Sequence, residues 1–241
     1  MSDTLVFIPA WNEEDNLPAV LDELQAGLPD CKVLVVDDGS TDGTASIARD
    51  RGAEVLSFGE NRGLRQGIAA GYAYAHENGY EFVGRVDADG QHPVDELARL
   101  LALVRGGEAD VAVGSRFATG DGYEAYRYEP SPSRRLGTSA LRRAMHPALG
   151  QPFLDATSGM YAANRLAMPI LGVPYTSRAP EVESLLRLRE AGLRIAEVPV
   201  HMRERASGES KLRGSKAVKL VVTVVGTLLL YGVWRRVRRS R

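Results

Sequence analysis

The sequence predicts an α/β protein with a mostly parallel central sheet covered by helices on both faces. Short apolar runs typical of buried strands alternate with segments of helical periodicity, and short loops join them. Strands that alternate with helices in this way pair mostly in parallel. The unusual polar residues follow directly after strands, at the edge where such sheets bind ligands.

The individual elements follow from local patterns along the chain. Strands are predicted at 5–8, 33–36, 55–58, 82–86, 111–113 and 195–200. Helices are predicted from about residue 16, at 45–51, at 66–78, from residue 93, at 134–149 and at 181–190. Pro93 suits the first turn of its helix, and Gly79 suits the C-terminal cap of the preceding one. Residues 118–132 form a Gly-, Tyr- and Pro-rich loop, either a lid over a binding site or a surface excursion.

Composition limits the class of protein. The 241 residues suffice for one large domain or a domain with an appendage, and the net charge of −1 argues against a nucleic-acid partner. Cys31 is the single cysteine, which excludes an internal disulfide and a cysteine zinc site and suits a reducing compartment. The first residues lack the pattern of a signal peptide, so we expect the body of the protein to be cytoplasmic.

The C-terminal segment predicts contact with a membrane. Residues 220–234 are apolar throughout and are followed by an arginine-rich tail, so we divide the chain into a domain at 1–212 and a membrane-associated helix at 213–241. A helix over 220–234 is roughly 22 Å long, short of the ~30 Å hydrocarbon core. It could therefore span a thinned bilayer, lie in the interface, or pack against a small membrane-protein partner. The basic tail favours the anionic cytoplasmic leaflet, whereas a buried helix of the soluble domain is the competing interpretation.

The strongest chemical motif follows the strand predicted at 82–86. Asp87 and Asp89 are two residues apart, so both carboxylates can reach one cation if the backbone turns between them, and Gln91 follows. Mg²⁺ and Mn²⁺ prefer oxygen ligands and typically share the ion with substrate phosphates. We therefore predict a metal site at Asp87, Asp89 and Gln91, with an ordinary turn and helix cap as the alternative. His92 is expected to be a turn residue.

Two further motifs follow the first two strands. Asp37 and Asp38 stand where carboxylates can accept hydrogen bonds from a nucleobase or ribose. Ser40 or Thr41 is expected to cap the next helix. In the segment 9–13, Trp11 offers a flat surface for a base, although a tryptophan at a strand end is more often a packing residue.

Taken in order, these motifs resemble the family 2 glycosyltransferases, most closely the dolichol-phosphate mannose synthase-like branch. The matching segments are 9–13, 36–44, 61–63, 87–93, 114–116, 157–159, 197–200, Arg205 and 208–212. The resemblance covers about residues 5–212. It implies a GT-A fold and inverting, metal-dependent transfer of a sugar from a nucleoside diphosphate sugar. In that branch the acceptor is a polyprenyl phosphate, which suits the apolar C-terminus.

The resemblance also implies roles for individual residues. The predicted donor-binding residues are Pro9, Ala10, Trp11, Glu13, Asp37, Asp38, Arg65, Asp87, Ala88, Asp89 and Lys211. The candidate catalytic residues are Asp89, Arg116, Arg205 and Glu183. Arg116 and Arg205 would meet phosphate or acceptor. Two departures from the family pattern are Trp11, where tyrosine is usual, and Arg65, which stands in a segment that usually carries small residues.

The acceptor decides whether a general base is needed. A lipid phosphate is largely ionised near pH 7 and needs none, whereas a sugar hydroxyl requires one. Glu183 or Glu181 is the candidate for that second case, and the alternative for both is first-turn stabilisation of their helix. The competing functions are therefore a transferase that extends a cell-wall or surface glycan at a hydroxyl, and a non-catalytic membrane scaffold.

Overall fold

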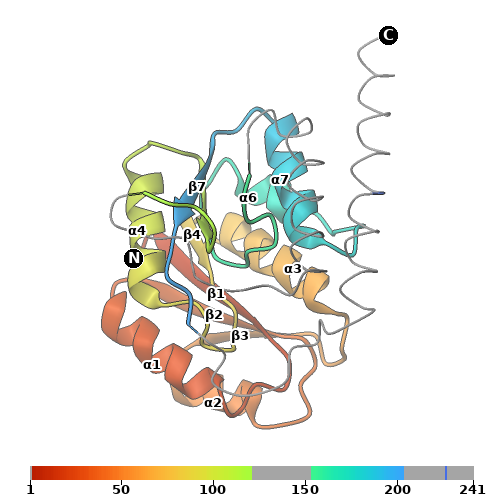
Figure 1. Ribbon diagram of the computed structural model, residues 1–241. Coiled ribbons are helices and arrows are strands. Elements are labelled where there is room, and N and C mark those ends of the chain that lie inside the picture. The colour runs from red at the N-terminus through yellow and green to blue at the C-terminus, as the bar shows by residue number, and fades with distance from the viewer. Residues whose placement is uncertain (1, 121–152, 204–225, 227–241) are drawn as a thin grey trace, which may run out of the picture.

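The computed structural model describes residues 2–120, 153–203 and Gly226 (Figure 1). Most of the loop expected at 118–132, the helix expected at 134–149, the helix expected at 220–234 apart from Gly226, and the candidate residues Arg205 and Lys211 lie outside the described residues. Within the described parts of the chain, no helix is long and apolar enough to cross a membrane.

One seven-stranded sheet organises the chain, in the order β3-β2-β1-β4-β6-β5-β7. The strands are β1 (Thr4–Ala10), β2 (Lys32–Asp37), β3 (Glu54–Ser57), β4 (Phe82–Arg85), β5 (Val111–Ser115), β6 (Tyr161–Asn164) and β7 (Ile195–Pro199). All neighbours pair in parallel except β6, which is antiparallel to both β4 and β5. The prediction of a mostly parallel sheet is confirmed, and β6 is the strand that it missed.

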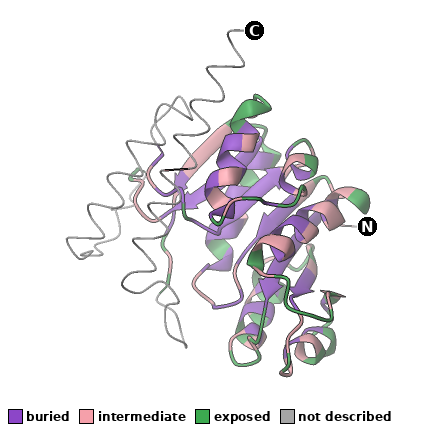
Figure 2. Ribbon diagram, turned by 90° about the vertical axis from the view of Figure 1, so that its right-hand side faces the viewer, coloured by how far each residue is buried: buried purple, intermediate pink, exposed green. Residues whose placement is uncertain are grey.

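Helices cover both faces of the sheet, as predicted (Figure 1). The helices are α1 (Leu17–Gly27), α2 (Thr44–Asp50), α3 (Leu64–Glu77), α4 (Val94–Arg105), α6 (Met168–Leu171) and α7 (Pro180–Glu190). Residues of α1, α2 and α4 share one core cluster, and residues of α3, α6 and α7 share the other. Strand β1 alternates between the two clusters, because successive side chains of a strand point to opposite faces. Figure 2 shows the strands buried between helices whose outer sides are more exposed.

Close packing between α3 and β1 depends on a glycine. A Cβ atom added at Gly71 would lie 2.2 Å from the ring of Phe7, so only glycine lets the helix approach this closely. The Phe7 ring meets Tyr72 edge-on, with centroids 4.8 Å apart. Both aromatic rings are buried, which fixes α3 and the loop before it against the first strand.

The topology brings the motifs to one edge of the sheet. The parallel strands β1, β2, β4, β5 and β7 all end there, so the segments that follow them meet. Strand β6 runs the other way and therefore starts at this edge, where Tyr161 pairs with both Arg85 and Val113. The segment just before Tyr161 is thereby placed between the ends of β4 and β5.

Candidate active site

The Asp87–Asp89 loop is held from within by its own residues. The backbone N–H of Asp87 donates to Nδ1 of His92 at 3.0 Å, and the N–H of Gln91 donates to a carboxylate oxygen of Asp89 at 3.1 Å. Burial lowers the pKa of His92 and outweighs the opposing charges of Asp87 and Asp89. A neutral ring is required for Nδ1 to accept. His92 lies in the bend before α4, consistent with a turn residue, and its buried side chain also holds the loop.

A buried arginine lies behind this loop. Arg85 is only 2% exposed, and its Nη2 lies 3.3 Å from Asp87 and 3.2 Å from Glu181 on α7. Its Nε is one of the buried nitrogen atoms of the described residues that have no hydrogen-bond partner. Burial raises the pKa of Glu181, against the charge of Arg85. Arg85, a residue that the sequence motifs did not single out, therefore links the Asp87–Asp89 loop to α7.

Glu183 has a different environment from Glu181. Its carboxylate accepts from the N–H groups of Thr176 and Ser177 and pairs with Arg187. Burial raises the pKa of Glu183, but these donors and the charge of Arg187 bring it below its ordinary value. A carboxylate so well satisfied is a weak base, and the geometry favours a role in holding the loop before α7.

Asp37 and Asp38, the acids expected near the nucleoside, join neighbouring loops through hydrogen bonds. Asp38 accepts from the N–H of Arg62 at 2.6 Å and of Gly63 at 2.8 Å. Asp37 accepts from the N–H of Ser40 and from the hydroxyl of Ser57. Both acids are almost fully buried, at 4% and 3% exposed. Their adjacency thus has a structural explanation, and their contact with a nucleotide stays a prediction.

The first motif is joined to the second by side-chain hydrogen bonds. The N–H of Asn12 donates to the Ser40 hydroxyl, and the N–H of Thr41 donates to the Asn12 side chain. The prediction that Ser40 or Thr41 caps the next helix is wrong, because Gly43 stands at the N-cap and the Asp42 carboxylate accepts from the N–H of Thr44 instead. Both side chains are therefore used to join the loops.

The remaining residues of this motif differ in exposure. Pro9 and Ala10 are buried at the end of β1, whereas Trp11 is 41% exposed. Glu13 accepts from the Asn16 side chain. Trp11 thus offers an accessible flat surface at this edge, as a base-stacking residue requires.

Arg65, the predicted donor contact, lies in the first turn of α3. Its Nη1 donates to the backbone carbonyls of Thr176 and Ser177, each at 3.2 Å. The same two residues bind Glu183 through their N–H groups. Arg65 therefore connects the start of α3 to the loop before α7, and a contact with the donor sugar stays a prediction.

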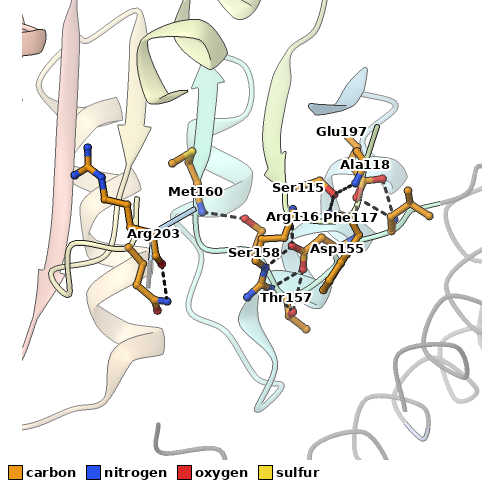
Figure 3. Close-up of polar contacts among 12 residues, drawn as sticks. Ser115, Arg116, Phe117, Ala118, Asp155, Thr157, Ser158, Met160, Glu197 and Arg203 are labelled. Carbon is orange, nitrogen blue, oxygen red and sulfur yellow. Dashed lines mark hydrogen bonds and ion pairs between the residues drawn. The ribbon is translucent and has the colours of Figure 1, made fainter. Parts of the chain in front are cut away.

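Arg116 is fixed by a carboxylate that sequence reasoning missed (Figure 3). Its Nε and Nη2 donate to the two oxygens of Asp155, both at 2.7 Å, and its backbone N–H donates to the same carboxylate at 3.1 Å. The Asp155 side chain is fully buried, whereas that of Arg116 is 32% exposed. The only sequence signal was the position of Asp155 directly ahead of the segment 157–159.

A second carboxylate supports the first. Glu197 on β7 accepts from the backbone N–H groups of Leu154, at 2.8 Å, and Asp155, at 2.6 Å. Burial raises the pKa of Glu197, although the hydrogen bonds that it accepts act in the opposite direction. Strand β7 thereby fixes the backbone that carries Asp155, and Asp155 fixes Arg116.

The segment before β6 also lies against the Asp87–Asp89 loop. A Cβ atom added at Gly159 would lie 2.6 Å from a carboxylate oxygen of Asp87. This close approach requires glycine and puts Asp87 beside the strand whose start carries Asp155. The two halves of the site therefore share residues 155–160.

The donor set suits a divalent cation that is shared with a ligand. Among the described residues, no group of three or more His, Cys, Asp or Glu side chains is placed to hold a metal ion. Asp87 and Asp89 project from one loop, with the buried Ala88 between them and the amide of Gln91 nearby. Mg²⁺ is commonly held by one or two carboxylates together with substrate phosphates, and this set fits that pattern.

Comparison with known proteins gives the family. Residues 5–162 match glycosyl transferase family 2. The chain is 35% identical over 228 residues to an undecaprenyl-phosphate mannosyltransferase of Micrococcus luteus, covering 91% of each chain. It is 32% identical over 248 residues to a polyprenol monophosphomannose synthase of Mycolicibacterium smegmatis, covering 99% of this chain and 90% of the relative.

A solved structure gives the fold. The crystal structure of glucosyl-3-phosphoglycerate synthase from Mycobacterium tuberculosis, in complex with Mn²⁺, UDP-glucose and phosphoglyceric acid, superposes with a TM-score of 0.67 at 22% identity. The match covers 93% of this chain and 79% of that one. The chain belongs to glycosyl transferase family 2 and is a glycosyltransferase, which confirms the resemblance that its motifs indicated.

Proposed function

We propose that this enzyme transfers a sugar from a nucleoside diphosphate sugar, GDP- or UDP-linked, to a polyprenyl phosphate, with inversion at the anomeric carbon. The proposal rests on one observation: two groups that could bind phosphates, one through a metal ion and one directly, lie close together at one edge of the sheet. The Asp87–Asp89 loop suits a metal–diphosphate and lies beside Gly159, and Asp155, in the same short segment, holds Arg116 as a fixed cation. The names of the mannosyltransferase relatives support the acceptor.

The reaction joins an acceptor oxygen to the anomeric carbon while the bond from that carbon to the diphosphate breaks. A Mg²⁺ or Mn²⁺ ion at Asp87, Asp89 and Gln91 would supply neutralisation of the departing diphosphate. The exposed ring of Trp11 would stack on the base, and the Asp38-bound turn at 62–63 would shape the pocket beside it. The positive charge of Arg116, whose Nε and Nη2 are held by Asp155, would attract and orient the acceptor phosphate.

Acid–base chemistry favours a phosphate acceptor over a hydroxyl. The second pKa of a phosphate monoester is about 6, so the nucleophilic oxygen is largely ionised at neutral pH. A hydroxyl acceptor needs a general base. The Glu183 carboxylate already accepts hydrogen bonds from backbone N–H groups and pairs with Arg187. Glu181 is paired with the buried Arg85. Neither glutamate is placed as a free base, which supports the lipid-phosphate reaction.

The membrane contact belongs to the same proposal. A lipid acceptor requires that the catalytic domain at 1–212 work at a membrane surface, and the apolar segment at 220–234 with its basic tail would hold it at the cytoplasmic face. Arg205 and Lys211 would add positive charge near the acceptor phosphate. A small membrane-protein partner is an alternative way to hold the same segment.

The test is acceptor-dependent release of nucleotide. The purified full chain is incubated with Mn²⁺ or Mg²⁺, a panel of UDP- and GDP-sugars, and a short polyprenyl phosphate or none. Release that depends on the acceptor and disappears in Asp89→Ala supports the proposal and names the donor. Asp22→Asn on the exposed side of α1 is a matched carboxylate control that should keep full activity. Turnover with a glycan alone would favour the hydroxyl reaction, and failure to bind any nucleotide would favour a scaffold.

A further inference from the structure

Glu23 and Arg203 form an ion pair next to Gln91, one of the proposed metal ligands, and neither residue takes part in the proposed reaction. Arg203, which follows β7, donates from Nη1 and Nη2 to the two carboxylate oxygens of Glu23 on α1, at 2.6 and 2.9 Å. The Arg203 guanidinium holds the pKa of Glu23 below its usual range, against the opposing effect of burial. In Figure 3 this guanidinium points away from the Arg116–Asp155 pair. It therefore does not belong to the acceptor side of the site.

Both partners of this ion pair also form hydrogen bonds with the turn from Gln91 to Val94. The backbone N–H of Arg203 donates to the carbonyl of Gln91 at 2.9 Å, and the side-chain amide of Gln91 donates back to the carbonyl of Arg203 at 3.3 Å. Glu23 accepts from the N–H of Val94 at 3.0 Å. The turn from Gln91 to Val94 is thus bound at both ends by one ion pair.

Helix α1 provides a firm base for this arrangement. Val94 begins α4, so its N–H is one of the amides that a helix leaves without an internal partner. A carboxylate at this position also suits the helix dipole. A Cβ atom added at Gly27 would lie 2.8 Å from Val94, so α1 and the start of α4 pack at close range. Glu23 therefore has a fixed position relative to the turn.

We infer that Glu23 and Arg203 are positioning residues that set the affinity of the Asp89–Gln91 segment for a divalent cation. They do so by binding both ends of the Gln91–Val94 turn, and we call this set of contacts the clasp. This inference rests on the proposed metal-dependent function. These contacts join α1, the Gln91–Val94 turn and the residues that follow β7. Stability alone does not account for them, because the two side chains are 32% and 52% exposed and such pairs contribute little to folding.

The experiment compares Mn²⁺ affinity in Glu23→Gln, Arg203→Met and the double variant of the full chain, by titration followed by electron paramagnetic resonance. Partners bound directly to ligand side chains typically change metal affinity ~10–100-fold. The clasp acts on backbone, so we expect a loss of about three- to tenfold in each single variant, and no further loss in the double variant. Asp22→Asn is the matched control, because Asp22 is on the same helix and pairs with Arg51, away from the loop.

Hydrogen exchange separates this inference from the proposed function. In the metal-free enzyme, the amides of Val94 and Arg203 should exchange faster in the clasp variants than in wild type or Asp22→Asn. Failure of the wild type to bind Mn²⁺ would overturn both the metal-dependent function and the effect on affinity, and faster exchange in the variants would then show only that the contacts hold the turn. Unchanged exchange, or Mn²⁺ affinity in the clasp variants equal to that of Asp22→Asn, would overturn the inference.

Discussion

Substituting Asp155 with asparagine tests the acceptor side of the site most directly. The carboxylate of Asp155 accepts three hydrogen bonds from Arg116, two from the guanidinium and one from the backbone N–H. Asparagine has one acceptor oxygen and would turn an N–H₂ group toward the arginine. Asp155→Asn therefore keeps the volume of the side chain but breaks the bidentate pair.

The magnitude follows from the burial of the two partners. Removing one partner of a fully buried ion pair costs about 3–5 kcal/mol. Asp155 is fully buried but the Arg116 side chain is 32% exposed, so water can solvate the freed guanidinium and the cost should be nearer 2–3 kcal/mol. At about 2–4 °C per kcal/mol in a domain of this size, Tm should fall by about 5–10 °C.

The functional effect is separable from the loss of stability. Without Asp155, the Arg116 guanidinium keeps its charge but loses its fixed direction, so binding of the acceptor phosphate should weaken. We expect the KM for polyprenyl phosphate to rise about tenfold, which corresponds to ~1.4 kcal/mol, while nucleotide affinity stays near wild type. Circular dichroism gives Tm, and initial rates at saturating donor give KM and kcat.

The chain offers a matched control at the opposite edge of the sheet. Asp110, just before β5, forms a similar forked pair with Arg194. The hydrogen bonds from Arg194 lower the pKa of Asp110, although burial opposes them. Its stabilising effect is therefore present at neutral pH and is lost as pH falls through the lowered value, below about 4. Asp110→Asn should reduce Tm but leave the acceptor KM unchanged. An unchanged KM in Asp155→Asn at temperatures where it is folded would refute the role of Arg116.

Three further substitutions probe the site from other sides. Gly159→Ala should weaken Mn²⁺ binding about tenfold, because the added Cβ would lie 2.6 Å from a carboxylate oxygen of Asp87 and must displace that carboxylate. A Mn²⁺ affinity equal to that of wild type would contradict this contact. Arg85→Met should lower the free energy of unfolding, measured in urea, by about 3–5 kcal/mol, because it leaves Asp87 and Glu181 without their cation. Adding Glu181→Gln should restore part of that free energy, whereas additive effects of the two substitutions would argue against coupling. Burial raises the pKa of Glu197, so the stability that its protonated form contributes is present below about pH 4.5 and is lost as pH rises through the raised value. Unfolding of wild type and Glu197→Gln at pH 5 and pH 7 should therefore show wild type gaining relative to the variant at the lower pH.

Local patterns were sufficient for most of the fold. The segments 5–8 and 34–36 are apolar runs buried on both faces, so their signal does not depend on tertiary context. Strand β6 was missed because Tyr161–Asn164 is short and its centre is two alanines, which have little preference for strands. Its buried position, between β4 and β5, is set by its neighbours rather than by its own residues.

The sequence predicted which loops meet at one edge of the sheet, but not their individual contacts. The loops that follow the strands do meet there, because parallel topology brings the strand ends together. The sequence could not show that Asp37 and Asp38 bind loop backbone, since their partners include Ser57 and Gly63, 20 and 25 residues away. Likewise, Arg116 and Asp155 are 39 residues apart and meet only because β6 starts where β5 ends.

The reversed strand β6 explains how the Asp87–Asp89 loop and Arg116, the two sides of the proposed reaction, are held together. In a fully parallel sheet, the residues before β6 would enter from the opposite edge and could reach neither Asp87 nor Arg116. Because β6 runs antiparallel, Tyr161 pairs with β4 and β5 at once, and the residues before it lie between the two strand ends. Gly159 approaches Asp87 and Asp155 orients Arg116, so in the proposed reaction this short segment would fix the spacing between the leaving diphosphate and the acceptor phosphate. In-line transfer depends on that spacing, since a misplacement of about 1 Å can cost 10²-fold in rate.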